Sequence, residues 1–183
     1  MNRIPVIAVI GANRADDEIF EIARSVGEAI ADRGFHLVCG GKEGVMKAAC
    51  SGFRFARNEL NSVRTLAIGV LPDDSASAAN EYVDLAIPTG IGIARNAIIT
   101  RMADGVISVG GGSGTLSELA YAWQMGKPIA AMATSGGWSQ KLAGQAIDGN
   151  RRDVVFAAQS AYEALGYIVQ QLENAKRFLP DSH

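Results

Sequence analysis

Residues 108–118 read SVGGGSGTLSE and bring bare backbone, hydroxyl groups and a carboxylate together in one short stretch. The stretch directly follows an apolar run at residues 105–109. Glycine allows a bound group to approach the main chain closely, and the free N–H groups at the start of a helix attract anions. The chemistry that this stretch predicts is the binding of a phosphate. The candidate ligands of that phosphate are Gly110, Gly111, Gly112, Ser113, Gly114 and Thr115.

Glu118 can serve either the helix or the site. Thr115 and Glu118 have the spacing of a capping box, in which the glutamate folds back onto the start of its own helix. The apolar residues of this helix share one stripe of a helical wheel: Leu116, Leu119, Ala120 and Trp123. Glu118 lies almost opposite that stripe, which predicts a carboxylate facing the mouth of a cleft or solvent. The spacing leaves both readings open.

Arg95 is the second residue whose position requires an explanation. The apolar residues of its predicted helix also form a stripe: Ile91, Ala94, Ile98 and Met102. Arg95 falls within or beside this stripe, and a buried guanidinium needs a partner because an unpaired charge is costly to bury. That partner is either an internal carboxylate or a bound anion, and the planar fork of arginine suits phosphate better than an ammonium group does.

Short apolar runs alternate with longer amphipathic stretches along the chain. Strands are expected at residues 6–10, 35–39, 65–70, 82–87, 105–109, 128–132 and around 154–156. Helices are expected at 16–33, 45–57, 92–103 and 114–125, and two more flank 154–156, while 72–80 is a loose polar loop. The strands are continuous Val, Ile and Ala runs, which is typical of a parallel sheet buried on both faces. The sequence therefore predicts an α/β fold, in which residues 1–183 form a single domain with a doubly wound, Rossmann-like parallel sheet flanked by helices.

Glycines and polar residues follow the first two predicted strands as well. Ligands of such folds bind at the carboxyl ends of the strands. The candidates in these loops are Gly11, Asn13, Arg14, Gly40, Gly41 and Gly44. Lys42 and Glu43 also lie there, either within reach of the same ligand or in solvent. Neither GxxxxGK[ST] nor GxGxxG is present, so the sequence indicates neither a P-loop nor an ordinary dinucleotide site.

Composition and charge exclude several classes of protein. The chain has 183 residues, 48% hydrophobic and 20% charged, and a net charge of −2, which favours a globular protein without a general attraction to nucleic acid or anionic membranes. No apolar stretch has transmembrane length, and the run at 4–10 reads as a first strand, so we expect a cytoplasmic protein. Cys39 and Cys50 lack CxxC spacing and are expected to be reduced, packed thiols. The two histidines form no Cys/His cluster, so no metal site is expected.

Several of these motifs together resemble the LOG family, once called lysine-decarboxylase-like. The resemblance rests on Gly44-Val45-Met46 after Gly40-Gly41, on Arg95, and on the stretch from Gly111 to Glu118. The family pattern is PGGxGTxxE preceded by an Arg-Lys pair; here Gly110 replaces the proline and Asn96 replaces the lysine. This version is similar to a bacterial branch that includes molybdenum cofactor carrier proteins.

The resemblance implies roles for individual residues. It adds Val45, Met46 and Asn96 to the ligand-binding set, and it implies that Arg95 and Glu118 are the catalytic residues if the chain is a hydrolase. It also implies a homo-oligomer, either a dimer or a tetramer. No lysine suits a pyridoxal phosphate site, so lysine decarboxylase activity is excluded.

Two functions are therefore expected, with a nucleotide-sensing regulator as a less favoured third. The first is a binding protein for a phosphate-bearing, nucleotide-like ligand, with the molybdenum cofactor (molybdopterin) as a candidate. The second is a nucleoside 5′-monophosphate phosphoribohydrolase, which cleaves an N-glycosidic bond. The replaced proline and lysine favour the first. We expect a small phosphorylated ligand, no required cofactor, and neither nucleic acid nor membrane as a partner.

Overall fold

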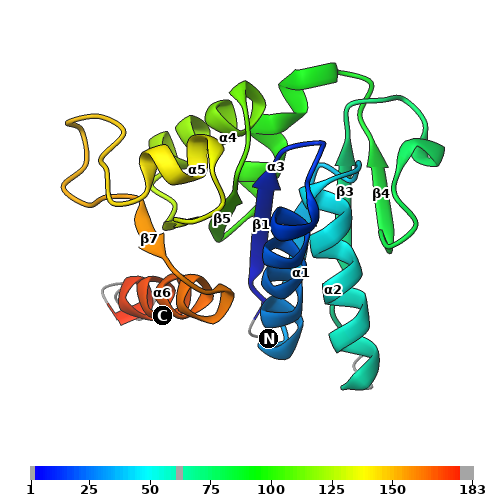
Figure 1. Ribbon diagram of the computed structural model, residues 1–183, viewed down its shortest axis with the longest axis horizontal. Helices are drawn as coiled ribbons and strands as arrows, with labels where there is room; N and C mark the ends of the chain where they lie inside the picture. Colours follow the sequence, from blue (N-terminus) through cyan, green and yellow to red (C-terminus); the bar gives the residue numbers. More distant parts are fainter. Residues whose placement is uncertain (1–2, 61–63, 178–183) are drawn as a thin grey trace, which may run out of the picture.

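The computed structural model describes residues 3–60 and 64–177, which form a seven-stranded parallel sheet between two layers of helices (Figure 1). The strand order is β4-β3-β2-β1-β5-β6-β7. The strands are β1 (Val6–Gly11), β2 (His36–Cys39), β3 (Ala67–Leu71), β4 (Leu85–Pro88), β5 (Gly105–Val109), β6 (Ile129–Met132) and β7 (Phe156–Ala158). The predicted doubly wound parallel sheet is confirmed.

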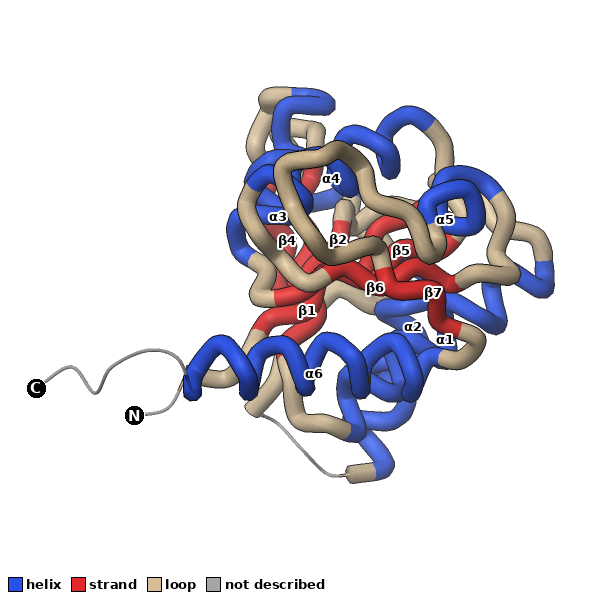
Figure 2. Tube along the Cα trace, turned by 90° about the vertical axis from the view of Figure 1, so that its left-hand side faces the viewer, coloured by secondary structure: helices blue, strands red, loops and turns tan. Residues whose placement is uncertain are grey.

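Two sets of helices cover the two faces of the sheet. The helices are α1 (Asp17–Asp32), α2 (Val45–Glu59), α3 (Asn96–Met102), α4 (Ser113–Gln124), α5 (Gly137–Leu142) and α6 (Ala161–Arg177). Figure 2 shows α1, α2 and α6 on one side of the sheet and α3, α4 and α5 on the other. Alternate residues of β1 feed the two cores: Ile7 and Val9 pack in one, Ala8 and Ile10 in the other. Burial on both faces explains why the strands are continuous apolar runs.

The strand order reverses between β1 and β5, and this reversal creates the place for a site. These two strands pair in parallel from Ile7 opposite Gly105 to Gly11 opposite Val109. The chain leaves β1 for α1 on one face and leaves β5 for α4 on the other, so the two loops diverge. In open parallel sheets this divergence opens a crevice at the carboxyl ends of the strands.

The predicted helix at 92–103 is wrong in its first part. Residues Gly92–Arg95 form a 3-10 turn, η2, and only Asn96–Met102 form the helix α3. The predicted apolar stripe fails in its first half, because Ile91 and Ala94 are exposed, whereas Ile98 and Met102 are partly buried against the core. The buried residues of α3 are Asn96, Ile99 and Thr100. A 3-10 turn has three residues per turn instead of 3.6, so the change of geometry shifts every later side chain around the axis.

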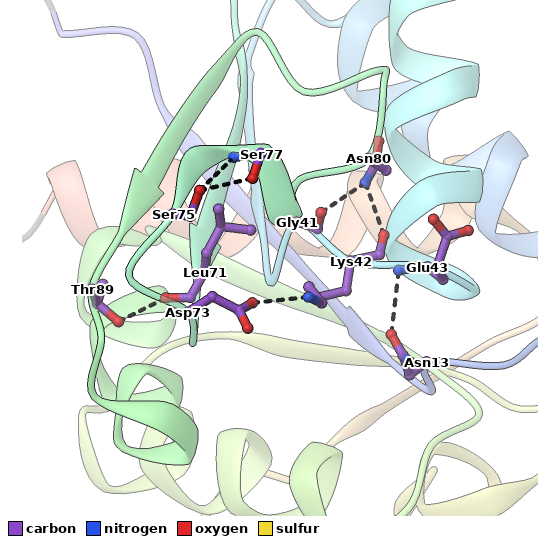
Figure 3. Close-up of polar contacts among 10 residues, drawn as sticks. All are labelled: Asn13, Gly41, Lys42, Glu43, Leu71, Asp73, Ser75, Ser77, Asn80 and Thr89. Atoms are coloured by element: carbon purple, nitrogen blue, oxygen red, sulfur yellow. Dashed lines mark hydrogen bonds and ion pairs between the residues drawn. The ribbon is translucent and has the colours of Figure 1, made fainter.

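The loop at 72–80 is held in place rather than loose. It contains the short 3-10 helix η1 (Ala76–Ala78). The side-chain amide of Asn80 donates to the carbonyls of Gly41 (3.2 Å) and Lys42 (2.8 Å) (Figure 3). Its main-chain N–H also donates to Gly41 O, at 2.8 Å. These bonds fix the loop to the segment that follows β2.

The thiols of Cys39 and Cys50 are free and buried, as predicted. Their sulfur atoms lie 3.5 Å apart between the end of β2 and α2. In the described part of the chain, no helix is both long and apolar enough to cross a membrane.

Candidate functional site

A cavity of about 630 Å³ lies where the strand order reverses. It is bordered by the ends of β1 and β2, the turn η2 and the first turn of α4. Most of the predicted site residues line it: Gly11, Asn13, Arg14, Gly40, Met46, Arg95, Asn96, Gly112, Ser113, Gly114, Thr115 and Glu118. The structure thus brings residues from four separate segments to one hollow.

Arg95 ends the η2 turn, and its side chain is largely buried, with 13% exposed. Its Nε and Nη1 atoms are buried without any hydrogen-bond partner. The nearest carboxylate oxygen, Oε1 of Glu118, lies 4.0 Å from Nη1, which is too far for a hydrogen bond. A buried guanidinium with two unsatisfied nitrogens is costly, so this geometry is suited to an added acceptor group.

Gly40 provides the space that Arg95 occupies. A Cβ atom at this position would lie 2.2 Å from Nη1 and 2.6 Å from Nη2 of Arg95. It would also lie 2.6 Å from the sulfur of Met46. Any side chain at residue 40 would therefore displace the guanidinium, which makes this glycine part of the site.

Glu118 lies on the buried face of α4, so the prediction that it lies opposite the apolar stripe is wrong, but its side chain does line the cavity. The buried residues of this helix are Thr115, Glu118, Leu119, Ala122 and Trp123. The alternative of a capping box is wrong too. The helix begins at Ser113, with Gly112 as its N-cap, so Glu118 lies in the second turn, beyond reach of the cap position.

Burial controls the charge of Glu118. Only 6% of the residue is exposed, and desolvation raises its pKa from the ordinary 4.5 to about 7, against a smaller opposite effect of the Arg95 charge. Near neutral pH, this carboxyl group is therefore shared between its neutral and charged forms. The floor of the cavity consequently carries a full cation beside a partly neutral acid.

The first turn of α4 supplies further positive character. Its N-cap, Gly112, makes no side-chain capping bond, and Gly112, Ser113 and Gly114 are exposed at the cavity. The N–H groups of a first helical turn have no partner within the helix and mark the positive end of the helix dipole. Arg95 and this helix start therefore present donors to the same hollow.

Five predicted binding residues do not line the cavity: Gly41, Gly44, Val45, Gly110 and Gly111. Gly110 instead connects the loop to α5 and to the turn before it. Its N–H donates to Ser135 Oγ at 2.7 Å, and its carbonyl accepts from Ser139 Oγ at 2.8 Å. Gly111 likewise accepts from the N–H of Trp138 at 3.0 Å. These residues set the path of the loop from behind.

Asn96 lines the cavity but is also a brace. Its side-chain amide donates to Ser117 Oγ at 2.8 Å and to the carbonyl of Gly114 at 3.4 Å. These bonds join the start of α3 to the first turn of α4. They therefore hold Arg95, the preceding residue, in a fixed relation to the helix start.

The cavity also contains residues that the sequence did not single out, among them Pro72 and Ile93. Apolar side chains give no chemical signal in a sequence, so neither was a candidate. For Lys42 the sequence allowed either a contact with the ligand or a position in solvent. Lys42 lines the cavity, and its Nζ forms an ion pair with Asp73 at 2.8 Å (Figure 3). Beside it, Asn13 Oδ1 accepts from the N–H of Glu43 at 3.2 Å, which links the loops after β1 and β2.

Among residues 3–60 and 64–177, no three side chains of His, Cys, Asp or Glu are grouped as a metal site requires. The charged side chains that line the cavity are three cations, Arg14, Lys42 and Arg95, and one acid, Glu118, and the first turn of α4 adds main-chain N–H donors. Such a set binds an anion.

Comparison with known proteins yields a family and several similar structures. The model of the SLOG cluster4 family matches residues 4–165. An uncharacterized protein of Archaeoglobus fulgidus is 42% identical over 126 residues, which cover 69% of this chain and 78% of that protein. The match to the family model agrees with the resemblance to the LOG-like superfamily inferred from the glycine-rich stretch.

Two solved structures extend over nearly the whole chain. The molybdenum cofactor binding protein of Rippkaea orientalis has a TM-score of 0.76 at 31% identity, covering 95% of this chain and 98% of its own. The molybdenum cofactor carrier protein of Chlamydomonas reinhardtii has a TM-score of 0.75 at 29% identity, covering 92% and 99%.

Proposed function

Because the chain belongs to the SLOG cluster4 family, we propose that it is a binding protein for a small phosphate-bearing ligand of the nucleotide or pterin type. The molybdenum cofactor is the specific candidate, since proteins that bind or carry it are similar over almost the full chain. The observation that carries the proposal is the buried guanidinium of Arg95, with two nitrogens that lack any partner at the floor of the cavity.

The residues present fit a phosphate group. Arg95 offers a planar pair of donors, and the uncapped first turn of α4 offers main-chain N–H groups from Ser113 to Thr115. Both sets of donors line the same cavity, and charge-assisted bonds to a guanidinium are among the strongest that a protein forms. The cavity volume of about 630 Å³ is in the usual range for sites that hold small molecules.

The raised pKa of Glu118 is relevant to the choice between binding and hydrolysis. A phosphorylated sugar that loses its base develops positive charge, which an ionised carboxylate stabilises better than a neutral carboxyl group does. The pKa of Glu118 is already about 7, and Arg95 is the group that lowers it. An anion bound to Arg95 offsets that effect, so the bound state favours the neutral acid. In its neutral form, Glu118 would have an O–H group to donate to a ligand but no negative charge with which to stabilise a cation.

The phosphoribohydrolase is the second candidate, because Arg95 and Glu118 do meet at the base of the cavity. It predicts release of free base from nucleoside 5′-monophosphates, with turnover lost in Glu118→Gln. The binding protein predicts no release of base, and retention of ligand in the same variant. Chromatography of the reaction products with wild-type protein and the variant separates the two.

The direct test measures what the protein carries. The protein is produced in a host that synthesises the molybdenum cofactor and is purified without oxygen, after which pterin fluorescence and molybdenum are measured per chain. We expect wild-type protein to retain pterin and Arg95→Gln to retain about tenfold less. Arg101→Gln is the matched control, since Arg101 lies on the adjoining helix and is exposed. Equal pterin in all three proteins, or none in the wild type, contradicts the proposal.

A further inference from the structure

Ile93 is the most exposed large apolar side chain in the described part of the molecule, with 87% of its surface accessible, and it lines the cavity. A side chain of this kind usually gains from being covered. Its position two residues before Arg95 in the η2 turn places it at the mouth of the cavity, while the guanidinium lies at the base. The same turn therefore offers an apolar contact outside and a cation inside.

The backbone holds Ile93 in this exposed position. The N–H of Gly92 donates to the carbonyl of Pro72, and the N–H of Gly90 donates to that of Asp73, both at 3.0 Å. Thr89 binds the carbonyl of Leu71 twice, through Oγ1 at 2.7 Å and through its N–H at 3.2 Å (Figure 3). Four hydrogen bonds thus fasten the segment before Ile93 to the segment after β3.

Pro72 belongs to the same fixed platform and also lines the cavity. Lys42, which pairs with Asp73, lies beside it. A rigid apolar surface next to a polar rim binds a flat ring well, because the surface needs no rearrangement before it is covered. The phosphate donors lie at the base, so the flat part of a bound molecule extends toward this platform.

We propose that Ile93, with Pro72, is a specificity-determining contact that packs against the planar heterocycle of the phosphorylated ligand. This inference rests on the proposed function and names the part of the ligand that the phosphate site does not recognise. It predicts that a ring-bearing phosphate binds more tightly than the same sugar phosphate without a ring.

The probes are GMP, whose guanine shares the 2-amino-4-oxopyrimidine edge of a pterin, and ribose 5-phosphate, which lacks the ring. Titration calorimetry on wild-type protein is expected to give tighter binding of GMP. Ile93→Ala is expected to weaken GMP binding about tenfold and to leave ribose 5-phosphate within about twofold, because only the ring loses its contact. Ile93→Phe, which restores an apolar surface, is expected to keep GMP binding near the wild-type value.

Ile91→Ala is the matched control, because Ile91 is 50% exposed on the same segment but does not line the cavity. An unchanged GMP affinity in Ile93→Ala overturns the inference. Equal loss of both probes, together with a change of molecular mass in light scattering, also overturns it and assigns Ile93 to an interface between two copies. If Arg95→Gln loses both probes and Ile93→Ala has no effect, the inference fails but the proposed function stands. If wild-type protein neither binds a probe nor carries pterin, the inference and the proposed function both fail.

Discussion

The glycine-rich loops after β2 and β5 look alike in the sequence but differ in what their glycines do. Gly44, after β2, has a φ of 62°, and a Cβ there would lie 2.5 to 2.7 Å from main-chain atoms of residues 12–14. Gly112, after β5, has a φ of −105°, and a Cβ there would meet nothing within 4 Å. Gly44 lets one part of the protein pack against another, whereas Gly112 leaves its backbone open to the cavity. Substitutions at the two loops should therefore separate stability from binding.

The largest expected effect on stability is that of Gly44→Ala. Its Cβ collides with backbone atoms, which cannot move aside as a flexible side chain can, and the left-handed conformation adds strain. We expect a loss of about 3 kcal/mol in the free energy of unfolding, measured with urea. Gly112→Ala, the matched substitution in the other loop, should change it by less than about 0.5 kcal/mol. Similar values for the two variants would mean that the loops do not differ in this way.

Gly40→Ala tests the exception, a glycine of the first loop that serves the site. Its Cβ collides with the end of the Arg95 side chain, which can swing away, so the cost in stability should stay near about 1 kcal/mol. The displaced guanidinium no longer reaches the anion position, and we expect the affinity for ribose 5-phosphate to fall by up to about tenfold, as on removal of the guanidinium. Calorimetry and urea unfolding of one preparation give both numbers. Wild-type affinity in this variant would show that the position of Arg95 is unimportant for the anion.

Glu118→Gln should remove a pH dependence of the free energy of unfolding that arises from the helix after β5. The pKa of Glu118 is about 7 in the folded protein and about 4.5 in the unfolded chain, so the folded state binds more protons between these values. Its contribution to stability is therefore present at low pH and is lost as the pH rises toward 7 and beyond. From pH 5 to pH 8, wild-type protein should lose on the order of 2 kcal/mol that the glutamine variant retains.

The difference between wild-type protein and Glu118→Gln isolates this carboxyl group, because all other titrating groups are common to both. Glu59→Gln, at an exposed position at the end of α2, is the control and should follow the wild-type curve. Parallel curves for wild type and Glu118→Gln would indicate that Glu118 titrates as an exposed carboxyl group does.

The fold could be predicted from sequence because parallel strands buried on both faces carry a local signal, the continuous apolar run. The glycine-rich stretch and Arg95 were identifiable for a similar reason, since bare backbone and a charge within an apolar pattern are both unusual. The orientation of Glu118 was not predictable, because α4 also packs against α3, a tertiary contact that the apolar pattern of α4 alone does not reveal. The 3-10 turn at η2 likewise broke the helical period on which the stripe around Arg95 depended.

The different roles of the glycines in the two loops could not be predicted from the sequence either. Gly44 and Gly112 differ through tertiary neighbours, the loop after β1 in one case and open space in the other. Pro72 and Ile93 reach the cavity only because the segment after β3 is fastened beside η2. Apolar residues of the cavity wall can be identified only from this placement, whereas charged residues and glycines can be recognised as candidates from the sequence.

The smallest expected effect is that of Gly114→Ala, which also gives the most direct test of the difference between the loops after β2 and β5. This residue lies in the first turn of α4, lines the cavity, and has open space where a Cβ would project. Alanine restricts the unfolded chain and suits a helix better, so the folded protein should gain about 0.5 kcal/mol. The added methyl group stands at the phosphate-binding surface, so affinity for ribose 5-phosphate should fall about threefold. Opposite signs in urea unfolding and calorimetry are the expected result, because the open glycines of this loop exist for close approach and not for packing. A gain in stability without any loss of affinity would show that the phosphate does not reach this turn.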